Sequence, residues 1–237
     1  MSDPIVFTGL TLEQANATAL YQASHGAVVR VTPDGNGTFT VAVTHPATAT
    51  GAGESNGSAA GVDGDVRPSQ QQIAWGKKVS ADFKSRVIAI CSGLGCDPSF
   101  LMAAMAFETG ATFSPTLQNP RSGATGLIQF LPSTANSLGT SIAALLQMTA
   151  VAQLDIVQKY LAPFKGRMRS LSDLYMAILF PAAVGRPDSF VLFAAPTIAY
   201  EQNRGLDVNH DGQVTKGEAT SKVQARLDEG LAIANRG

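Results

Sequence analysis

Residues 46–70 constrain the fold of this chain more strongly than any other segment. They are mainly alanine, glycine, serine, threonine and other small or polar residues, with almost no large apolar side chain. Such a segment buries too little apolar surface to offset the entropy cost of ordering its backbone, so this composition is typical of a flexible linker. The chain is therefore predicted to fold as two parts, a small one over residues 1–45 and a larger one over residues 71–237.

Residues 1–45 have the pattern of a compact α+β module with the order strand, helix, strand, strand. Residues 5–7 are strand-like, and residues 11–24 begin with a capping box and predict a helix. Residues 27–32 and 38–44 alternate apolar and polar side chains around a Pro-Asp-Gly-Asn-Gly turn, which predicts a β-hairpin. Because so small a module buries little surface by itself, we expect it to bind a ligand, dock on a partner or pair with a second copy. It resembles half of a small cell-wall-binding module in outline only.

The larger part has a helical pattern from residue 71 to the end, which predicts an all-α domain and makes the chain mainly α. One helix is expected to begin at Asp97 and Pro98, an N-cap residue followed by proline at the first helical position, and to end at Thr109 and Gly110. The spacing of apolar residues predicts the other helices over residues 79–90, 141–148, 150–161 and 172–180, with a last one that starts near Gly217.

The bulk properties of the chain exclude several classes of partner. With 17 lysines and arginines against 18 aspartates and glutamates, the formal net charge is −1 at pH 7, so no basic field attracts nucleic acid or anionic membranes. The longest apolar runs are too short to span a bilayer, so no membrane insertion is expected. The first residues lack the basic and apolar stretches of a standard signal peptide, so export would depend on cell lysis, a virion or a specialised secretion system.

The two cysteines, Cys91 and Cys96, leave the redox compartment open. They flank a Ser-Gly-Leu-Gly segment and match no zinc-binding pattern. Two partly buried thiols at a helix end and a local disulfide both fit this spacing.

Glu108 is the residue that points most directly to chemistry. It shares one face of the helix expected over residues 97–110 with Leu101, Ala104 and Met105, and it lies in the last helical turn. Burial on this face and the negative end of the helix dipole both disfavour a charged carboxylate, so both raise its pKa. A carboxyl group that keeps its proton near neutral pH can donate it to a glycosidic oxygen. The alternative is an exposed glutamate at the end of a helix.

The residues from Glu108 onward resemble a known family. In chain order, the matching motifs are Glu108-Thr109, Phe113-Ser114-Pro115, Ser122, Gly123-Ala124-Thr125-Gly126-Leu127-Ile128-Gln129-Phe130 and Pro132-Ser133-Thr134-Ala135. They are similar to the transglycosylase domain of the soluble lytic transglycosylases, including phage-borne relatives, whose pattern is Glu-Ser, Phe-Asn-Pro, Ser, Gly-x-x-Gly-Leu-Met-Gln and Pro-x-Thr-Ala. The resemblance covers roughly residues 75–205. Thr109 replaces the usual serine, Ile128 replaces methionine, and a few extra residues follow the glutamate.

The resemblance implies a lysozyme-like all-α catalytic domain that cuts the glycan strands of bacterial peptidoglycan. Glu108 would be the single acid/base for the β-1,4 bond between N-acetylmuramic acid and N-acetylglucosamine, and cleavage would leave 1,6-anhydromuramoyl ends. Ser122 would hydrogen-bond the sugar, while Gln129 and the backbone of Gly126 would line the cleft. Glycines that form a tight turn, and a glutamine with a structural role, are the alternatives for these positions.

Two tyrosines are candidates for further substrate contacts. Tyr175 lies where the family has a Tyr-Asn-Ala-Gly element, but the tyrosine-asparagine pair is missing, so a core tyrosine is the preferred interpretation. Tyr200 could match the last cleft tyrosine of the family.

Two other functions stay open at this point. A lysozyme-type muramidase on the same fold would hydrolyse the same bond, with a second acidic residue that positions water. A non-catalytic cell-wall-binding or virion structural protein would keep the fold without the chemistry. The expected partner is the glycan strands of peptidoglycan, and the expected place of action is the bacterial periplasm or cell wall. An endolysin, a tail-borne phage enzyme and a secreted effector fit the sequence equally well.

Residues 207–218 match a complete EF-hand calcium loop. Gly212 occupies the sharp turn at loop position 6, and Thr215 occupies the position that a water molecule often bridges. Calcium prefers oxygen ligands, which the loop would supply from Asp207, Asn209, Asp211, the carbonyl group of Gln213, and Glu218. Because the sequence has one such loop, we expect a structural Ca²⁺ ion and no organic cofactor. A metal-free polar turn is the alternative.

Overall fold

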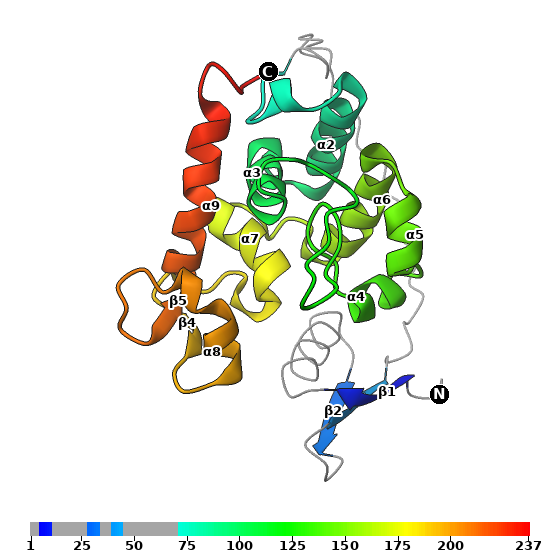
Figure 1. Cartoon of the computed structure of the whole chain (residues 1–237), viewed down its shortest axis with the longest axis vertical. Coiled ribbons are helices and arrows are strands. Elements are labelled where there is room, and N and C mark those ends of the chain that lie inside the picture. The colour runs from blue at the N-terminus through cyan, green and yellow to red at the C-terminus, as the bar shows by residue number, and fades with distance from the viewer. Residues whose placement is uncertain (1–4, 11–27, 34–38, 45–70) are drawn as a thin grey trace, which may run out of the picture. The chain divides into compact units, whose positions relative to one another are not determined.

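The computed structural model describes residues 5–10, 28–33, 39–44 and 71–237 (Figure 1). The chain divides into two compact units, Met1–Arg67 and Pro68–Gly237, and each is described by itself. The predicted helix over residues 11–24 and the predicted linker over residues 46–70 lie outside the described residues. The boundary between the two units, between residues 67 and 68, falls within the predicted linker.

The first unit contains a three-stranded antiparallel sheet. β1 (Ile5–Leu10), β2 (Val28–Pro33) and β3 (Phe39–Thr44) are ordered β1-β3-β2, so β3 is the central strand. β2 and β3 pair in continuous register, with Val31 opposite Val41. This pairing confirms the two strands of the predicted hairpin, and β1 extends beyond the predicted residues 5–7.

The second unit is mainly helical, as predicted. Its α-helices are α2 (Ala81–Leu94), α3 (Pro98–Glu108), α4 (Pro132–Ser137), α5 (Ile142–Gln147), α6 (Ala150–Leu161), α7 (Leu171–Leu179), α8 (Ile198–Asn203) and α9 (Lys216–Leu231), and its 3-10 helices are η2 (Gly76–Lys78), η3 (Ala162–Phe164), η4 (Pro181–Ala183) and η5 (Arg204–Leu206). The predicted helix over residues 150–161 coincides with α6. No single helix within the described residues is long and apolar enough to cross a membrane, although α2 and α3 pass that test as a pair bent by 119°.

α3 is the central helix of this unit. It packs against α2, α7 and α9, which surround it in Figure 1. Its residues from Leu101 to Ala106 are all buried, because a helix that is apolar on every side needs partners on every side. Asp97 caps its start by accepting a hydrogen bond from the Ser99 amide at 2.7 Å, and Pro98 follows at the first position, which confirms the predicted start.

The all-α prediction is wrong at one place. β4 (Val191–Ala194) and β5 (Gln213–Thr215) form a two-stranded antiparallel sheet. β4 lies in a short apolar run, and a run of this length does not distinguish a strand from a buried helix segment. β5 lies inside the predicted calcium loop, where the sequence pattern indicates no strand. The six-residue helices α4 and α8 are also absent from the prediction, because so few residues show no helical period.

Both cysteines are free thiols at the end of α2. Gly95 ends the helix in the left-handed conformation, with a φ of 73°, and the Cys96 amide donates to the Cys91 carbonyl at 3.0 Å. A hydrogen bond with the Cys96 thiol and burial both raise the pKa of Cys91 above its usual range, so Cys91 stays a neutral thiol. The structure therefore agrees with the two-thiol alternative.

Backbone hydrogen bonds hold the first described residues of this unit against its last ones. The Ile73 amide donates to the Gly237 carbonyl at 2.8 Å, and the Gly237 amide donates to the Ile73 carbonyl at 3.3 Å. The buried indole of Trp75 donates to the Arg226 carbonyl at 2.9 Å. A side chain at Gly230 would collide with the Trp75 ring, so a glycine is required where this segment crosses α9.

Candidate functional site

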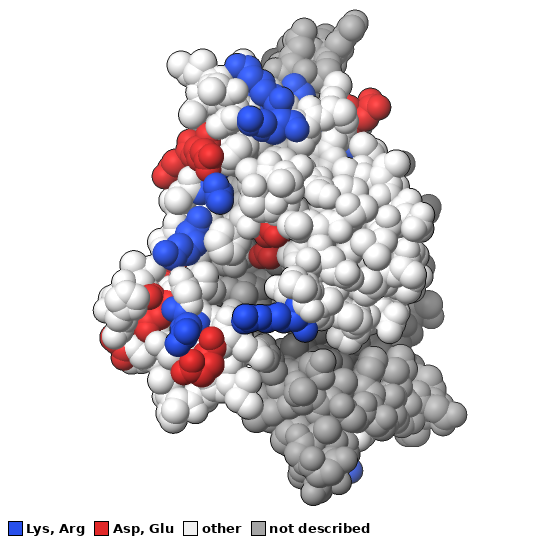
Figure 2. Space-filling view, viewed as in Figure 1, with Lys and Arg blue, Asp and Glu red and all other residues white. Residues whose placement is uncertain are grey.

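A cavity of about 410 Å³ opens beside the C-terminal end of α3. We call the side formed by α3 and α7 the inner wall and the side formed by α8 and η5 the outer wall. The lining residues are Phe107, Glu108, Tyr175 and Leu179 on the inner wall and Gln202, Asn203, Gly205 and Leu206 on the outer wall. On the molecular surface, acidic atoms lie at the centre of a hollow flanked by uncharged side chains (Figure 2).

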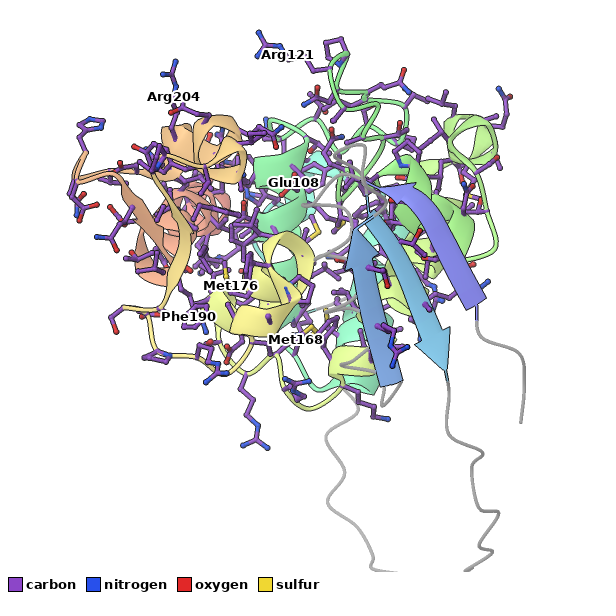
Figure 3. The ribbon with its side chains drawn as sticks, turned by 90° about the horizontal axis from the view of Figure 1, so that it is seen from below. Glu108, Arg121, Met168, Met176, Phe190 and Arg204 are labelled. Atoms are coloured by element: carbon purple, nitrogen blue, oxygen red, sulfur yellow. The ribbon has the colours of Figure 1, made fainter. Side chains whose placement is uncertain are left out.

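Glu108 supplies the only carboxyl group that lines the cavity among the described residues. It is half-buried, and burial raises the pKa of its carboxyl group from 4.5 to about 7. Within the described part of the chain, no lysine or arginine forms an ion pair with it. Arg121 and Arg204 point outward from the molecule, away from Glu108 (Figure 3). The direction of this pKa shift agrees with the prediction from the apolar helix face.

The residues after Glu108 end α3 at this position. Thr109 is buried, and its hydroxyl group donates to the Met105 carbonyl at 2.7 Å and accepts from the Phe113 amide at 3.1 Å. Gly110 follows with a φ of 59°, a conformation that favours glycine. These contacts keep Glu108 in the final turn of the helix, beside the cavity.

Tyr175 in α7 has the core position preferred for it, and it also lines the cavity. Only 1% of its surface is exposed, and its ring packs edge-on against Phe107 at 5.5 Å between ring centres. It nevertheless lines the cavity. Burial and, to a smaller extent, the charge of Glu108 raise the pKa of Tyr175 well above its usual range, so its hydroxyl group keeps its proton. Tyr175 is thus a core residue that forms the inner wall beside Glu108.

The loop between α3 and α4 carries three other predicted site residues, and the structure places none of them on the cavity. Ser122 is exposed, and its hydroxyl group accepts from the Ala124 amide at 3.3 Å. Gln129 donates its side-chain amide to the carbonyl groups of Gly126 at 3.0 Å and Leu117 at 3.3 Å. Gln129 therefore has the structural role considered for it. Substrate contacts of Ser122, Gly126 and Gln129 stay predictions.

Gln153 in α6, which the sequence analysis missed, holds this loop in place. It is completely buried, and its side-chain oxygen accepts from the Leu127 amide at 2.7 Å. Its side-chain nitrogen donates to the carbonyl groups of Pro115 at 3.0 Å and Leu145 at 3.3 Å. One sequence feature could have identified it: Gln153 is a lone amide side chain on the apolar face of residues 150–161. A polar side chain buried at such a position needs hydrogen-bond partners.

Replacing Gly126 by alanine is expected to lower the free energy of unfolding by about 2–4 kcal/mol. Gly126 has a φ of 83°, which strains any other residue, and a Cβ atom there would collide with the side-chain amide of Gln153. Urea denaturation measures the effect. Gly93→Ala is the matched control, since Gly93 lies inside α2 with open space around it and the same change should stabilise the helix by about 0.5–1 kcal/mol. Equal effects at the two glycines would contradict the assignment.

The loop over residues 207–218 has some of the features expected of a calcium site. Asp207 is 3% exposed, and its Oδ1 atom is buried without a hydrogen-bond partner among the described residues. Gly212 takes the expected sharp turn with a φ of 84°. Both oxygens of Glu218 accept hydrogen bonds within the loop, from the amides of Val208, Asn209 and Thr215. No three acidic, histidine or cysteine side chains in the described ranges surround one point as metal ligands would. The oxygen donors fit Ca²⁺, and Glu218 would have to exchange hydrogen bonds to bind it.

Tyr200 contacts the loop over residues 207–218 and does not line the cavity. Its hydroxyl group donates to Oδ2 of Asp207 at 2.7 Å. This hydrogen bond is the main reason that the pKa of Asp207 lies below its usual range, so the side chain is a carboxylate. The predicted role of Tyr200 as a cleft tyrosine is therefore not supported by its position. Its neighbours Gln202 and Asn203, which the sequence analysis did not single out, line the outer wall instead.

A buried ion pair lies beneath this region. Lys216, the first residue of α9, is 2% exposed, and its Nζ atom donates to Oδ1 of Asp173 at 2.6 Å. It also donates to the carbonyl groups of Arg186 at 2.8 Å and Ala183 at 3.2 Å. All three hydrogens of the ammonium group therefore have acceptors, and α7, α9, η4 and the segment after η4 meet at one side chain.

The raised pKa of Glu108 predicts a stability change that depends on pH. Above pH 4.5 the unfolded state loses its proton at Glu108, whereas the folded state holds it until about pH 7, so stability falls as the pH rises through this window. Glu108→Gln removes the ionisation. We expect the change in the free energy of unfolding caused by this substitution to be more favourable by about 3 kcal/mol at about pH 8 than at about pH 4. Urea denaturation at both pH values checks this. Glu229→Gln, at an exposed position of α9, should show no such difference, and an equal effect of Glu108→Gln at both pH values would contradict the expectation.

Compared with known proteins, the chain matches no protein-family model and no curated protein.

Proposed function

We propose that this protein cleaves the glycan strands of peptidoglycan as a lytic transglycosylase, and that its second unit has a lysozyme-like fold. The observation that carries the proposal is Glu108, a half-buried carboxyl group on a cavity wall with a pKa raised to about 7. Near neutral pH such a group is present both as an acid and as a base in comparable amounts, which suits a residue that must give up a proton and then take one back.

The proposed reaction needs one carboxyl group in two protonation states. Protonated Glu108 donates its proton to the oxygen that links N-acetylmuramic acid to N-acetylglucosamine, and the bond between this oxygen and C1 of the muramoyl sugar breaks. The 6-hydroxyl group of the muramoyl sugar then bonds to C1 and gives its proton to the Glu108 carboxylate. The products are a 1,6-anhydro end and a free 4-hydroxyl group, and Glu108 is protonated again.

The composition of the cavity favours this reaction over hydrolysis. Glycosidases that use water need a second carboxylate on the other side of the bond. Glu108 is the only carboxylate on the cavity among the described residues, and the other lining side chains are apolar or neutral. On one side of the hollow, at the right in Figure 2, the surface is uncharged, which suits a neutral sugar chain. A lysozyme-type muramidase is therefore the second candidate.

Analysis of digested sacculi by mass spectrometry tests the proposal. Purified protein should release muropeptides that carry anhydro ends and are lighter by one water than the products of a muramidase. Hydrated reducing ends would identify a muramidase, and the absence of any glycan cleavage would favour a non-catalytic cell-wall or virion protein.

We also propose that residues 207–218 bind a structural Ca²⁺ ion. The supporting observation is the buried Oδ1 atom of Asp207, because a carboxylate oxygen without a donor is costly unless a cation lies against it. Asn209, Asp211, Glu218 and the Gln213 carbonyl would complete the ligands.

Calcium is expected to raise the midpoint of thermal unfolding. At a free concentration of about 100 times the dissociation constant, one bound ion stabilises the folded state by about 2.7 kcal/mol. Differential scanning calorimetry with calcium and with excess chelator measures the shift. Glu218→Gln should abolish it, while Asp228→Asn, on the exposed face of α9, should retain it in full. A wild-type midpoint that does not respond to calcium would refute the proposed metal site.

A further inference from the structure

The outer wall of the cavity is held by few buried contacts. α8 provides Gln202 and Asn203 to this wall, yet none of its residues is buried. Ile198 at its start is 76% exposed. Its apolar contacts with the core come from the partly buried side chains of Ala199 and Tyr200, so polar contacts with its neighbours add to what holds α8 in position.

One of these polar contacts joins the outer wall to the calcium loop. Tyr200 lies in the middle of α8, and its hydroxyl group donates to Oδ2 of Asp207 at 2.7 Å. Asp207 directly follows Leu206, the last residue of η5 and itself part of the outer wall. The hydrogen bond therefore closes a small ring of chain, residues 200–207, that contains every residue of the outer wall.

The two carboxylate oxygens of Asp207 have different environments. Its Oδ2 atom accepts from Tyr200 and from the Gly212 amide at 3.1 Å, whereas its Oδ1 atom is buried without a partner in the described part of the chain. The same carboxylate thus holds α8 with one oxygen and offers the other to a cation. Fixing one oxygen of a rigid carboxylate also fixes the direction of the other.

We propose that Tyr200 is a positioning residue that couples calcium binding to the geometry of the outer wall. With a cation at Oδ1, the Asp207 carboxylate is held in one orientation, and the Tyr200 hydroxyl group holds α8 against it. Without the cation, the carboxylate is oriented by its hydrogen bonds from Tyr200 and the Gly212 amide alone among the described residues, so it holds residues 198–206 less firmly. This inference rests on the calcium site proposed above and is independent of the reaction at Glu108.

Hydrogen exchange measured by mass spectrometry tests the coupling on the full chain. In the wild type, calcium should slow amide exchange in residues 198–206 by about tenfold relative to the same protein in excess chelator. Tyr200→Phe removes one hydroxyl group and leaves the ring and every proposed calcium ligand in place. We expect isothermal titration calorimetry to show that this variant still binds calcium. Most of the calcium-dependent slowing of amide exchange in residues 198–206 should be lost. Tyr160→Phe is the matched control, because Tyr160 donates its hydroxyl group to the Ala177 carbonyl, away from the loop, and the calcium effect on residues 198–206 should persist.

Three results would overturn the proposal, and they have different meanings. If wild type and Tyr200→Phe bind calcium and gain equal protection in residues 198–206, Tyr200 does not couple the two sites. If calcium binds to the wild type without changing this exchange, the outer wall does not depend on the loop. If calorimetry detects no calcium binding by the wild type, the calcium site itself is wrong. Sacculus digestion is a separate measurement, so a failure of the proposed reaction would leave the exchange result unaffected.

Discussion

Glu108→Gln is expected to lower the rate of glycan cleavage by about 10²–10⁴-fold, because the variant has no proton to donate to the leaving oxygen. Glutamine has nearly the same shape as the protonated carboxyl group, so the cavity should keep its form. The pH profile of the wild type gives a second measurement. Since the protonated form starts the reaction, kcat/KM should fall as the pH rises through about 7, the pKa to which burial raises Glu108. Release of muropeptides from sacculi measures both effects.

Two further variants separate a catalytic carboxyl group from a merely structural one. Glu108→Asp keeps an acid but withdraws it by one methylene group, and we expect activity between those of the wild type and Glu108→Gln. Glu229→Gln, an exposed position of α9, should keep full activity. Full activity of a folded Glu108→Gln would remove Glu108 from the reaction and, with it, the proposed mechanism.

Lys216→Met is expected to lower the free energy of unfolding by about 3 kcal/mol, the lower end of the usual cost of removing one partner of a buried ion pair, because Lys216 is buried while 17% of the Asp173 side chain is exposed. Burial alone would raise the pKa of Asp173, but hydrogen bonds from Lys216 and from the Gly185 amide hold it below its usual range. Asp173 therefore stabilises the fold as a carboxylate above its ordinary pKa of 3.8, and this stabilisation is lost as the pH falls through the lower folded value. The deficit of Lys216→Met should accordingly shrink in strong acid.

Denaturant titration at several pH values measures this deficit. Lys222→Met is the matched control, because Lys222 lies on the exposed face of the same helix, and we expect a change within about 0.5 kcal/mol. The double variant Lys216→Met/Asp173→Asn should recover part of the lost stability, since it leaves no unpaired charge. If Lys216→Met is as mild as Lys222→Met, the buried pair contributes nothing to stability.

The sequence predicted the features that depend on neighbouring residues. Asp97 and Pro98 specify the start of α3 through capping and a fixed φ, and the apolar stripe of residues 150–161 matches α6 because its period is local. The burial of Glu108 followed from its position beside Leu101, Ala104 and Met105. The left-handed Gly212 followed from the spacing of the loop.

The features that the sequence did not predict depend on residues far apart in the chain. Lys216 meets Asp173 across 43 positions, and Gln153 meets Leu127 across 26. Local sequence patterns do not predict which distant residue a buried polar side chain will contact. Tyr200 is seven positions from Asp207, but the contact needs the turn made by η5, which has no periodic signal. The outer wall of the cavity was missed for the same reason.

The reciprocal hydrogen bonds between Ile73 and Gly237 have a practical consequence for engineering. Because residues 73 and 237 lie side by side, a circular permutant of residues 73–237 could connect them through a short glycine-rich bridge and open the chain elsewhere, for example at the exposed Ser122. Gly76 has no room for even a methyl group beside Gly237, so residues of an affinity tag fused directly after Gly237 would need to lead away from Gly76.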